Sequence, residues 1–372
     1  MDGVGMTAKN YADYIHQSGK GVCVVTADTP GFNYTEQYKI LRYKSFPIPT
    51  RNPYRFGLPI LDRRFSSELR NTQFDIIHAH CPFATGKLAM KIAKEQHIPV
   101  VATFHSKYRQ DFQHSIPINA VVDMMVRQIV KFYEQADEVW IPQASVEPTL
   151  REYGYKGQVQ VVDNGNDFVT SQHLYEKLRT EMRAELSINA NQTMLLFVGQ
   201  HIWEKNIGFI LDSLALIKHL PFKLYMIGTG YAVADIKSKI KQLGLSSKVE
   251  MVGNILDRNK LKRYYAAADM FLFPSLYDNA PLVVREAAAL QTPALMISGS
   301  TAAEIIRDGD NGFLCKNDTK QYAERIRYLM EHQEQIRNVG LRASKTIARS
   351  WEDVVAEVLG RYDEIIKSYK RK

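Results

Sequence analysis

Two acidic residues in the C-terminal half stand at a spacing that could hold a polyhydroxyl, phosphorylated ligand. Asp278 follows an apolar run, and Glu286 comes eight positions later in an expected helix that starts near Pro281. The loop carboxylate can accept hydrogen bonds from sugar hydroxyls, and the helical one can clamp a ribose diol. The N–H groups and positive dipole end of that helix form an anion site. An ordinary helix cap with a solvated glutamate explains the same pattern, so both interpretations stay open.

Three histidines are further candidates. His78 and His80 alternate along an expected strand, so both side chains lie on one face, as metal ligands would. No third ligand is apparent near them in the sequence, so we expect no metal. His105 ends the tripeptide Thr103-Phe-His105, where it could contact a ligand or cap a strand end as a buried histidine.

A glycine turn offers a competing interpretation. Gly228-Thr-Gly230 follows a strand and opens a helix, and Glu250 lies 20 residues beyond Gly230, as in dinucleotide-binding oxidoreductases. Val233 replaces the third glycine of that pattern, and the turn falls late, in the second half of the chain. An NAD-dependent oxidoreductase is therefore kept only as an alternative.

The elements that must position these residues alternate between apolar strands and amphipathic helices. Strands are expected at 21–26, 74–79, 98–104, 138–141, 159–162, 194–198, 222–227, 249–252, 270–273 and 293–297. Helices are expected at 84–96, 117–135, 146–153 and 351–369, between the strands 249–252 and 270–273, and from 207, 231 and 281 onward. The turn-rich stretch 163–167 interrupts this rhythm, which then restarts. The pattern predicts an α/β fold of two Rossmann-like domains with parallel sheets. We expect an N-terminal domain at 1–165, a C-terminal domain at 170–348 and a helix at 350–372 that crosses back to the first domain.

The start of the chain does not fit this rhythm. A helical pattern at 7–17 comes before any strand, although the helix of a βαβ unit follows its strand. Gly3 and Gly5 sit where a strand-to-helix phosphate loop belongs. We therefore expect that the first strand of the N-terminal domain is missing from this sequence. A fold that begins with a helix is the alternative.

Composition excludes several classes of protein. The 372 residues are 45% hydrophobic and 24% charged, as in ordinary globular proteins, and no apolar run approaches the ~20 residues that cross a bilayer. The three cysteines form no C-x-x-C pair, which argues against a disulfide framework or zinc site and favours the cytoplasm. The net charge of +8 favours anionic partners such as nucleotides or phospholipid head groups. Because the basic residues are dispersed and no nucleic-acid-binding signature is present, we expect no nucleic acid.

Several segments together resemble glycosyltransferase family 4, the retaining enzymes with the two-Rossmann GT-B fold. The stretch from Asp278 to Glu286 is similar to the E-x-x-x-x-x-x-x-E motif of that family. The other similar segments are Thr103-Phe-His105 (T-F-H), Asn164-Gly-Asn-Asp167 (N-G-x-D), Gly199-Gln-His-Ile-Trp-Glu-Lys205 (G-R-L-x-x-x-K), Gly228-Thr-Gly230 (G-x-G) and residues 299–312. The resemblance extends over nearly the whole chain and implies two parallel sheets that face an interdomain cleft.

The resemblance implies a nucleotide-sugar donor held mainly by the second domain. Glu286 would hold the donor ribose, Asp278 would contact hydroxyls of the transferred sugar, and Lys205 would pair with the leaving diphosphate. His105 would lie beside the sugar, so His105, Lys205 and Asp278 are the expected catalytic residues. The other expected donor contacts are Gly3, Gly199, Gly228, Gly230, Leu282 and Val283. No metal or other cofactor is implied.

Some positions depart from the family pattern. Gln200 replaces the usual arginine, which removes one phosphate-facing charge, and Asp278 is one methylene shorter than the usual glutamate. Ala280 and Pro281 replace the usual Phe-Gly, and Pro281 has no N–H to offer a donor. These changes keep open a catalytically weak or inactive sugar-nucleotide-binding homologue.

The acceptor is harder to predict. The helix at 84–96 carries three lysines along one face, and residues 106–132 mix basic and apolar side chains. Such a surface suits an anionic membrane, and related enzymes glycosylate lipids or lipid-linked saccharides. We therefore expect a lipid or saccharide acceptor and a cytoplasmic protein that can associate peripherally with the inner face of the membrane. A core-facing helix with solvated lysines is the alternative.

The resemblance also implies a UDP-linked rather than a GDP-linked hexose and transfer with retention. A double displacement would need a carboxylate on the opposite face of the sugar, but none follows His105 until Asp111. We expect a same-face substitution in which the leaving diphosphate takes the acceptor proton. Lys205 would stabilise the charge that develops on that diphosphate.

Overall fold

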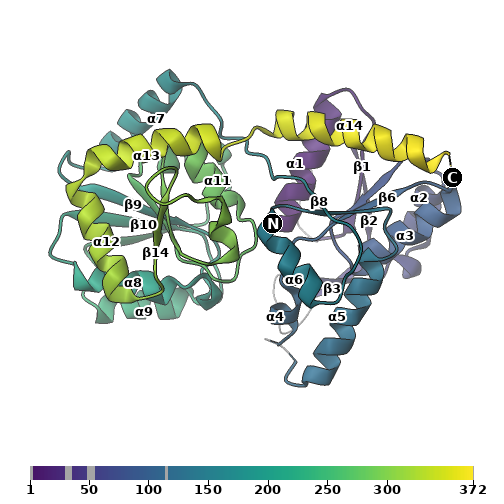
Figure 1. Ribbon diagram of the computed structural model, residues 1–372, viewed down its shortest axis with the longest axis horizontal. Coiled ribbons are helices and arrows are strands. Elements are labelled where there is room, and N and C mark those ends of the chain that lie inside the picture. Colours follow the sequence, from purple (N-terminus) through teal and green to yellow (C-terminus); the bar gives the residue numbers. More distant parts are fainter. Residues whose placement is uncertain (1–2, 30–35, 48–54, 114–115, 372) are drawn as a thin grey trace. The chain divides into compact units, whose positions relative to one another are not determined.

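The structure, a computed structural model, describes residues 3–29, 36–47, 55–113 and 116–371. The chain divides into two compact units. The first consists of Met1–Asn164 together with Trp351–Lys372, and the second of Gly165–Ser350. In Figure 1 each unit has strands at its centre and helices around them.

A six-stranded parallel sheet forms the centre of the second unit, in the order β11-β10-β9-β12-β13-β14. In that order the strands are Val249–Gly253, Phe222–Ile227, Thr193–Val198, Met270–Phe273, Ala294–Ile297 and Phe313–Cys315. The helical elements of this unit are α7 (Gln172–Glu185), η3 (Trp203–Lys205), α8 (Ile207–Leu216), α9 (Val233–Gln242), α10 (Arg258–Ala267), α11 (Leu282–Ala289), η4 (Thr301–Ile305), α12 (Thr319–Glu331) and α13 (Gln333–Thr346). Every residue of β9, β12 and β13 is buried, because helices cover both faces of a parallel sheet.

The strand order of the second unit reverses at β9. The chain first adds β10 and β11 on one side of β9 and then returns to add β12, β13 and β14 on the other. The connections that follow the adjacent strands β9 and β12 therefore leave the same edge of the sheet in opposite directions. In open parallel sheets, ligands bind in the crevice at such a switch point, so a site is expected at this edge.

The first unit contains parallel strands in two separate sheets. β5 (Ile77–Ala79), β6 (Val100–Thr103), β7 (Glu138–Ile141) and β8 (Gln160–Val161) form one sheet, and β1 (Cys23–Ala27) pairs with β2 (Lys39–Tyr43) in the other. An antiparallel hairpin joins β3 (Ser45–Pro47) to β4 (Arg55–Gly57). The helical elements are α1 (Gly3–Gln17), η1 (Pro59–Leu61), α2 (Arg63–Arg70), α3 (Ala84–Gln96), α4 (Tyr108–Gln113), α5 (Asn119–Tyr133), η2 (Ala144–Val146), α6 (Glu147–Glu152) and α14 (Trp351–Tyr369). Within the described ranges, no helix is both long enough and apolar enough to pass through a membrane.

The last helix, α14, belongs to the first unit although it follows the second in the sequence. Its apolar stripe is buried and consists of Trp351, Val354, Val355, Val358, Tyr362 and Ile365. Figure 1 shows α14 running across α1, and the ring centres of Trp351 and Tyr11 lie 5.5 Å apart. The Tyr362 ring stacks on Trp140 of β7. Helix α14 therefore supplies part of the core of the first unit.

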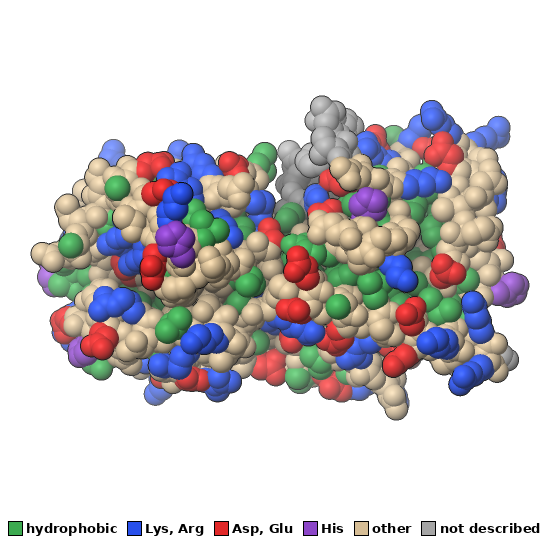
Figure 2. Space-filling model, turned by 90° about the horizontal axis from the view of Figure 1, so that it is seen from above, with side chains coloured by type: hydrophobic (Ala, Val, Ile, Leu, Met, Phe, Trp, Pro, Cys, Tyr) green, Lys and Arg blue, Asp and Glu red, His purple; other side chains and the backbone are tan. Residues whose placement is uncertain are grey.

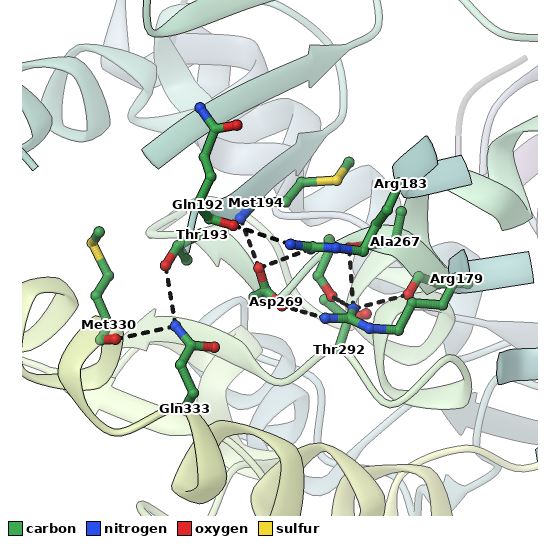
Figure 3. Close-up of polar contacts among 12 residues, drawn as sticks. Arg179, Arg183, Gln192, Thr193, Met194, Ala267, Asp269, Thr292, Met330 and Gln333 are labelled. Carbon is green, nitrogen blue, oxygen red and sulfur yellow. Dashed lines mark hydrogen bonds and ion pairs between the residues drawn. The ribbon is translucent and has the colours of Figure 1, made fainter. Parts of the chain in front are cut away.

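An ionic cluster around Asp269 fixes α7 to the sheet of the second unit (Figure 3). Asp269 is buried and accepts hydrogen bonds from Arg179, Arg183 and the backbone N–H of Met194. Arg179 also donates to the carbonyls of residues 266–268, where α10 ends. The last carbonyls of a helix have no N–H partner within it. The Arg179 guanidinium donates to these carbonyls and also pairs with the buried carboxylate of Asp269.

Most of the expected elements are present. The strands at 138–141, 222–227 and 270–273 and the helices at 84–96 and 351–369 have the predicted bounds. The sequence did not predict β2, β3, β4, α2, α4, α7, β14, α12 or α13. Several of these are short strands or polar helices whose residues carry a weak periodic signal, and tertiary contacts stabilise them.

One expectation about the start of the chain is wrong. Gly3 and Gly5 do not form a loop before a helix, because α1 already begins at Gly3. First-turn N–H groups need no partner within the helix, and the Thr7 hydroxyl donates to the carbonyl of Gly3. The missing first strand would precede the described residues and stays a prediction.

The burial of α14 gives a test of its role. We expect Trp351→Ala to lower the unfolding free energy of the first unit by about 3–5 kcal/mol, because the buried indole leaves a cavity against Tyr11. Glu352→Ala, one residue away on the exposed side, is the control and should change it by less than about 0.5 kcal/mol. Hydrogen exchange under denaturant, read separately for peptides of the two units, measures both. Equal protection in the two variants would show that α14 contributes nothing to the first unit.

Candidate active site

Lys205 and Asp278 meet at the carboxyl edge of the second sheet, at the switch point between β9 and β12. Lys205 ends η3, after β9, and Asp278 lies in the loop after β12. Their side chains form an ion pair at 2.5 Å and are mostly buried, with 12% and 17% of their surfaces exposed. The Lys205 ammonium also lies 5.5 Å from the centre of the Tyr277 ring. The structure thus brings two of the expected catalytic residues into direct contact.

The two carboxylate oxygens of Asp278 have different surroundings. Oδ1 accepts the hydrogen bond from Lys205, whereas Oδ2 is buried and has no hydrogen-bond partner among the described residues. A buried acceptor without a partner costs about 1–3 kcal/mol, which a ligand hydroxyl would recover. The arrangement suits a carboxylate that keeps one oxygen on a lysine and offers the other to a ligand.

Local interactions tie the two loops to each other. Asn206, directly after Lys205, has a left-handed backbone conformation (φ 60°, ψ 32°), which asparagine tolerates better than most residues. Its side-chain amide donates to the carbonyl of Pro274 at 3.2 Å. In the second loop, the buried hydroxyl of Ser275 accepts a hydrogen bond from the backbone N–H of Asp278. These contacts hold Lys205 and Asp278 in place without a ligand.

Glu286 is held by two donors. It is 7% exposed, and its Oε1 accepts from Arg258 at 2.8 Å while its Oε2 accepts from the Tyr265 hydroxyl at 2.9 Å. Arg258 also donates to Asp167. Burial disfavours the charge on Arg258, but Glu286 and Asp167 outweigh it and raise the pKa of the guanidinium. Each carboxylate oxygen has a second lone pair, so Glu286 can accept ligand hydroxyls while it is held.

The three glycines of the second unit that were expected to contact the donor, Gly199, Gly228 and Gly230, allow two loops to pack closely. A Cβ on Gly228 would lie 1.9 Å from the carbonyl oxygen of Gly199, and one on Gly230 would lie 2.4 Å from that of His201. Gly228 also has a φ of 135°, which side chains with a Cβ rarely adopt. The turn after β10 therefore requires glycine for packing against the turn after β9, whatever contact it makes with a ligand.

Helix α11 starts near this ion pair. Pro281 is its N-cap residue, so the helix begins at Leu282, one position later than expected. Leu282 and Val283 lie four and five residues after Asp278. The first N–H groups of a helix have no carbonyl partner within it. Leu282 and Val283 can therefore offer backbone donors at this edge, whereas Pro281 cannot.

The first unit places His105 in a cluster of imidazoles. His80 and His105 lie at the ends of the adjacent strands β5 and β6, and His80 Nδ1 is 3.0 Å from His105 Nε2. Sequence reasoning found no third histidine near His78 and His80, but the structure brings His105 there. The described residues contain no group of three or more His, Cys, Asp or Glu that could hold a metal ion. Gly3, also in this unit, has open space around it and makes no close approach.

Burial keeps these imidazoles neutral. It lowers the pKa of His105 to about 4, and burial together with the charge of His105 lowers that of His78 to about 3. The pKa of His80 is also well below the ordinary value, for the same reasons. His80 and His105 keep part of their surface accessible, yet protein atoms surround them closely enough to disfavour the charged form.

Sequence reasoning missed three residues of these clusters. Arg258 and Tyr265 lie on α10 and hold Glu286, and His201 lies in the segment after β9. Arg258 could have been found, because it opens the helix after β11 and so lies at the same edge as the other site residues. Tyr265 carried no signal, since it lies in the last turn of α10 among other apolar residues.

His201 occupies the position at which the similar family segment has leucine. The side chain is fully buried, and neither ring nitrogen has a hydrogen-bond partner among the described residues. Burial lowers its pKa from 6.5 to about 4. The unfolded chain therefore binds a proton below pH 6.5 that the folded protein does not, so this histidine costs stability as the pH falls from about 6.5 to about 4.

Replacement by the family residue tests this. We expect His201→Leu to raise the unfolding free energy of the second unit at pH 7 by about 1–3 kcal/mol, because it removes buried polar atoms without partners. The variant should also lose less stability than the wild type between pH 6.5 and 4. His219→Gln, at an exposed position, is the control and should leave the pH profile unchanged. Chemical denaturation at several pH values measures both, and a profile that His201→Leu leaves unchanged would contradict the assignment.

Comparison with known proteins gives the family. The model of glycosyltransferase family 4 matches residues 1–168, and the model of glycosyl transferases group 1 matches residues 179–346. Together the two models account for nearly all of both units.

Named relatives agree with the family models. The chain is 28% identical over 318 residues to the alpha-monoglucosyldiacylglycerol synthase of Streptococcus pneumoniae, across 83% of this chain and 70% of that protein. It is 21% identical to the N-acetyl-alpha-D-glucosaminyl L-malate synthase of Bacillus anthracis, across 100% of this chain and 96% of that one.

The fold is also found in solved structures. HepE of Anabaena, in complex with UDP and glucose, is 17% identical with a TM-score of 0.78 over 97% of this chain and 96% of that one. Sucrose-phosphate synthase of Thermosynechococcus elongatus is 19% identical with a TM-score of 0.81 over 99% and 94%. The expected GT-B fold is confirmed, and the chain consists of a glycosyltransferase family 4 domain followed by a glycosyl transferases group 1 domain.

Proposed function

We propose that the protein transfers a hexose from a nucleoside diphosphate sugar, UDP-hexose in preference to GDP-hexose, to a membrane lipid or saccharide with retention. The observation that carries the proposal is the pairing of Lys205 with Asp278, which leaves Asp278 Oδ2 buried and without a partner. A cation and an unpaired acceptor side by side suit a ligand that presents a phosphate and a hydroxyl. A sugar diphosphate has both groups next to each other.

The donor nucleotide is assigned by position and by likeness. Glu286 is buried and held by Arg258 and Tyr265, which suits a carboxylate that accepts from a ribose diol. The Anabaena structure contains UDP and glucose, which supports UDP as the nucleotide here. No residue that reads the base is evident, so the preference for UDP rests on that likeness.

In the proposed reaction, the bond between the anomeric carbon and the diphosphate oxygen breaks while an acceptor oxygen bonds to the same face of that carbon. The acceptor proton passes to the departing diphosphate. Lys205 and the first N–H groups of α11 stabilise the charge that develops there, because they favour the transition state over the ground state. Neutral His105 shapes the sugar side of the first unit and forms no covalent bond. No metal takes part in this mechanism.

The acceptor proposal rests on relatives and on surface chemistry. The Streptococcus relative is named as a synthase of a glucosylated diacylglycerol. On α5 most apolar side chains face the core, and the exposed side carries Met124, Arg127 and Lys131; α3 exposes three further lysines. Figure 2 looks down on the side on which α13 and α14 lie in Figure 1, not on α5, and that face mixes Lys and Arg with Asp and Glu. We therefore propose that the exposed sides of α3 and α5 contact anionic lipid, with the protein peripheral to the cytoplasmic face of a membrane.

The donor site yields a binding prediction. We expect Glu286→Gln to weaken UDP binding by about tenfold or more, because one hydrogen-bond acceptor for a diol loses its charge. The control is Glu250→Gln, since Glu250 is half exposed and stands where an NAD-binding acid belongs. Isothermal titration with UDP, GDP and NAD measures the three ligands. Millimolar binding of UDP and GDP alike would remove the basis for naming a nucleotide, and NAD binding that depends on Glu250 would overturn the assignment.

Lys205 yields a prediction about turnover. We expect Lys205→Ala to lower kcat by about 10²-fold, because the leaving diphosphate loses a fixed cation. Glu204→Gln, at the neighbouring position, is the control and should retain activity. Initial rates of sugar release from UDP-glucose compare the variants, and equal kcat values for the lysine variant and the wild type would remove Lys205 from the mechanism.

An acceptor screen tests the proposed function as a whole. Radiolabelled UDP-hexoses are offered with diacylglycerol in anionic vesicles, diacylglycerol in zwitterionic vesicles and soluble saccharides, with and without a chelator. We expect transfer with the chelator present, faster on anionic vesicles, and an α-linked product from an α-linked donor by NMR. An inverted product or a trapped glycosyl-enzyme adduct would refute the mechanism. Tight nucleotide binding without transfer to any acceptor would instead support the inactive homologue.

A further inference from the structure

A line of polar contacts connects α14 to His105 within the first unit. The Tyr362 hydroxyl of α14 lies 2.5 Å from His78 Nδ1, and His78 Nε2 lies 2.6 Å from the Thr103 hydroxyl of β6. The His78 ring packs on the His80 ring with centres 4.1 Å apart, and His80 Nδ1 bonds His105 Nε2 at 3.0 Å. A residue near the C-terminus is therefore three contacts away from His105.

His78 has no freedom to rotate. Both ring nitrogens bond hydroxyls, so a rotation about its side-chain bonds breaks two buried hydrogen bonds. Trp140 meets its ring edge-on at 5.0 Å, and Tyr11 does the same at 5.3 Å. Trp140 is in turn stacked on Tyr362, with a 10° angle between their planes. The aromatic rings and the two hydroxyls together form a rigid support for His78.

The contact between His80 and His105 also fixes a proton. Between two neutral imidazoles, one nitrogen must carry the hydrogen and the other must present its lone pair. The tautomers of His80 and His105 are therefore coupled as long as the His80 ring keeps its orientation, in which the two rings stack 24° from parallel. The packing of His78 on His80 acts on this coupling through the orientation of the His80 ring, which the hydrogen bond to His105 requires.

We propose that Tyr362, His78 and His80 are positioning residues that hold His105 in one orientation and one tautomer, so that α14 controls the state of the histidine expected to lie beside the sugar. The inference rests on the proposed function for the role of His105, but the relay itself can be observed without catalysis. Tyr362 matters here through its hydroxyl, which distinguishes this role from the packing role of the rest of α14.

The matched substitutions are Tyr362→Phe and Tyr369→Phe. Both remove one hydroxyl from α14, but Tyr369 lies at the end of the helix and away from the histidines in sequence. Nitrogen-15 NMR of the histidine rings in the full-length protein, with His105 assigned from His105→Gln, reports the tautomer. We expect the His105 nitrogen shifts to move toward the average of the two tautomers in Tyr362→Phe and to stay at the wild-type values in Tyr369→Phe.

Kinetics supplies the second measurement. With UDP-glucose as the donor, we expect Tyr362→Phe to lower kcat by about tenfold with KM for the donor unchanged. His80→Ala should lower kcat further, and His80→Asn, which keeps an amide near the Nδ1 position, should recover part of the loss. A purely structural role would lower the amount of folded protein without separating kcat from KM or distinguishing Asn from Ala.

The two hypotheses fail in different ways. If the His105 shifts respond to Tyr362→Phe but the wild type transfers no sugar, the relay stands and the proposed function fails. If the wild type is active and both tyrosine variants match it in nitrogen shifts and kcat, the relay is wrong. Wild-type shifts already at the average of two tautomers would also overturn it, because His105 would then have no fixed state to lose.

Discussion

A buried carboxylate keeps its charge only where cations and hydroxyls surround it, and the second unit is built to meet this condition at Glu286. Arg258 and Tyr265 each donate to one oxygen, and Asp167 balances the remaining charge of the guanidinium. Removing one partner from such a set leaves an uncompensated buried charge, which is costly. The network therefore fixes α10, α11 and the segment after Asn164 in one arrangement. Asp278, the ion-pair partner of Lys205, lies in the loop that leads into α11, so this ion pair depends on the same arrangement.

The ion pair at the switch point shows how the departures from the family pattern can be accommodated. Asp278 is shorter than the usual glutamate, yet its Oδ1 reaches Lys205, and the aspartate and lysine together leave one acceptor free for a ligand. Pro281 removes a backbone donor but caps α11, so the donors of Leu282 and Val283 remain at the edge of the sheet. The lost charge at Gln200 has no replacement among these residues, so the proposed function assigns the diphosphate to Lys205 as its principal cation.

The first unit relies on the opposite electrostatic condition. Its histidines are kept neutral by burial, so they act as hydrogen-bonding groups of fixed geometry rather than as cations. A neutral imidazole can bond to a hydroxyl or to another imidazole, and this allows Tyr362, His78, His80 and His105 to contact one another in sequence. The aromatic rings of α1, β7 and α14 close this part of the core, which ties the end of the chain to residues near its start.

By itself, the sequence determined the alternation of strands and helices, the two-unit division near residue 165, and Asp278, Glu286, Lys205 and His105 as candidates. These features are local, because hydrophobic period, turn chemistry and motif spacing are properties of short segments. Tertiary structure decided which side chains meet. Arg258 and Glu286 are 28 positions apart in the sequence, His80 and His105 are 25 apart, and Tyr362 and His78 are 284 apart. It also placed Gly3 in the first turn of a helix. Glycine is compatible with either a loop or a first helical turn, so the packing of the rest of the unit decides between them. Contacts at such separations depend on how the sheets are ordered and which helix returns to which core, and no short segment encodes either.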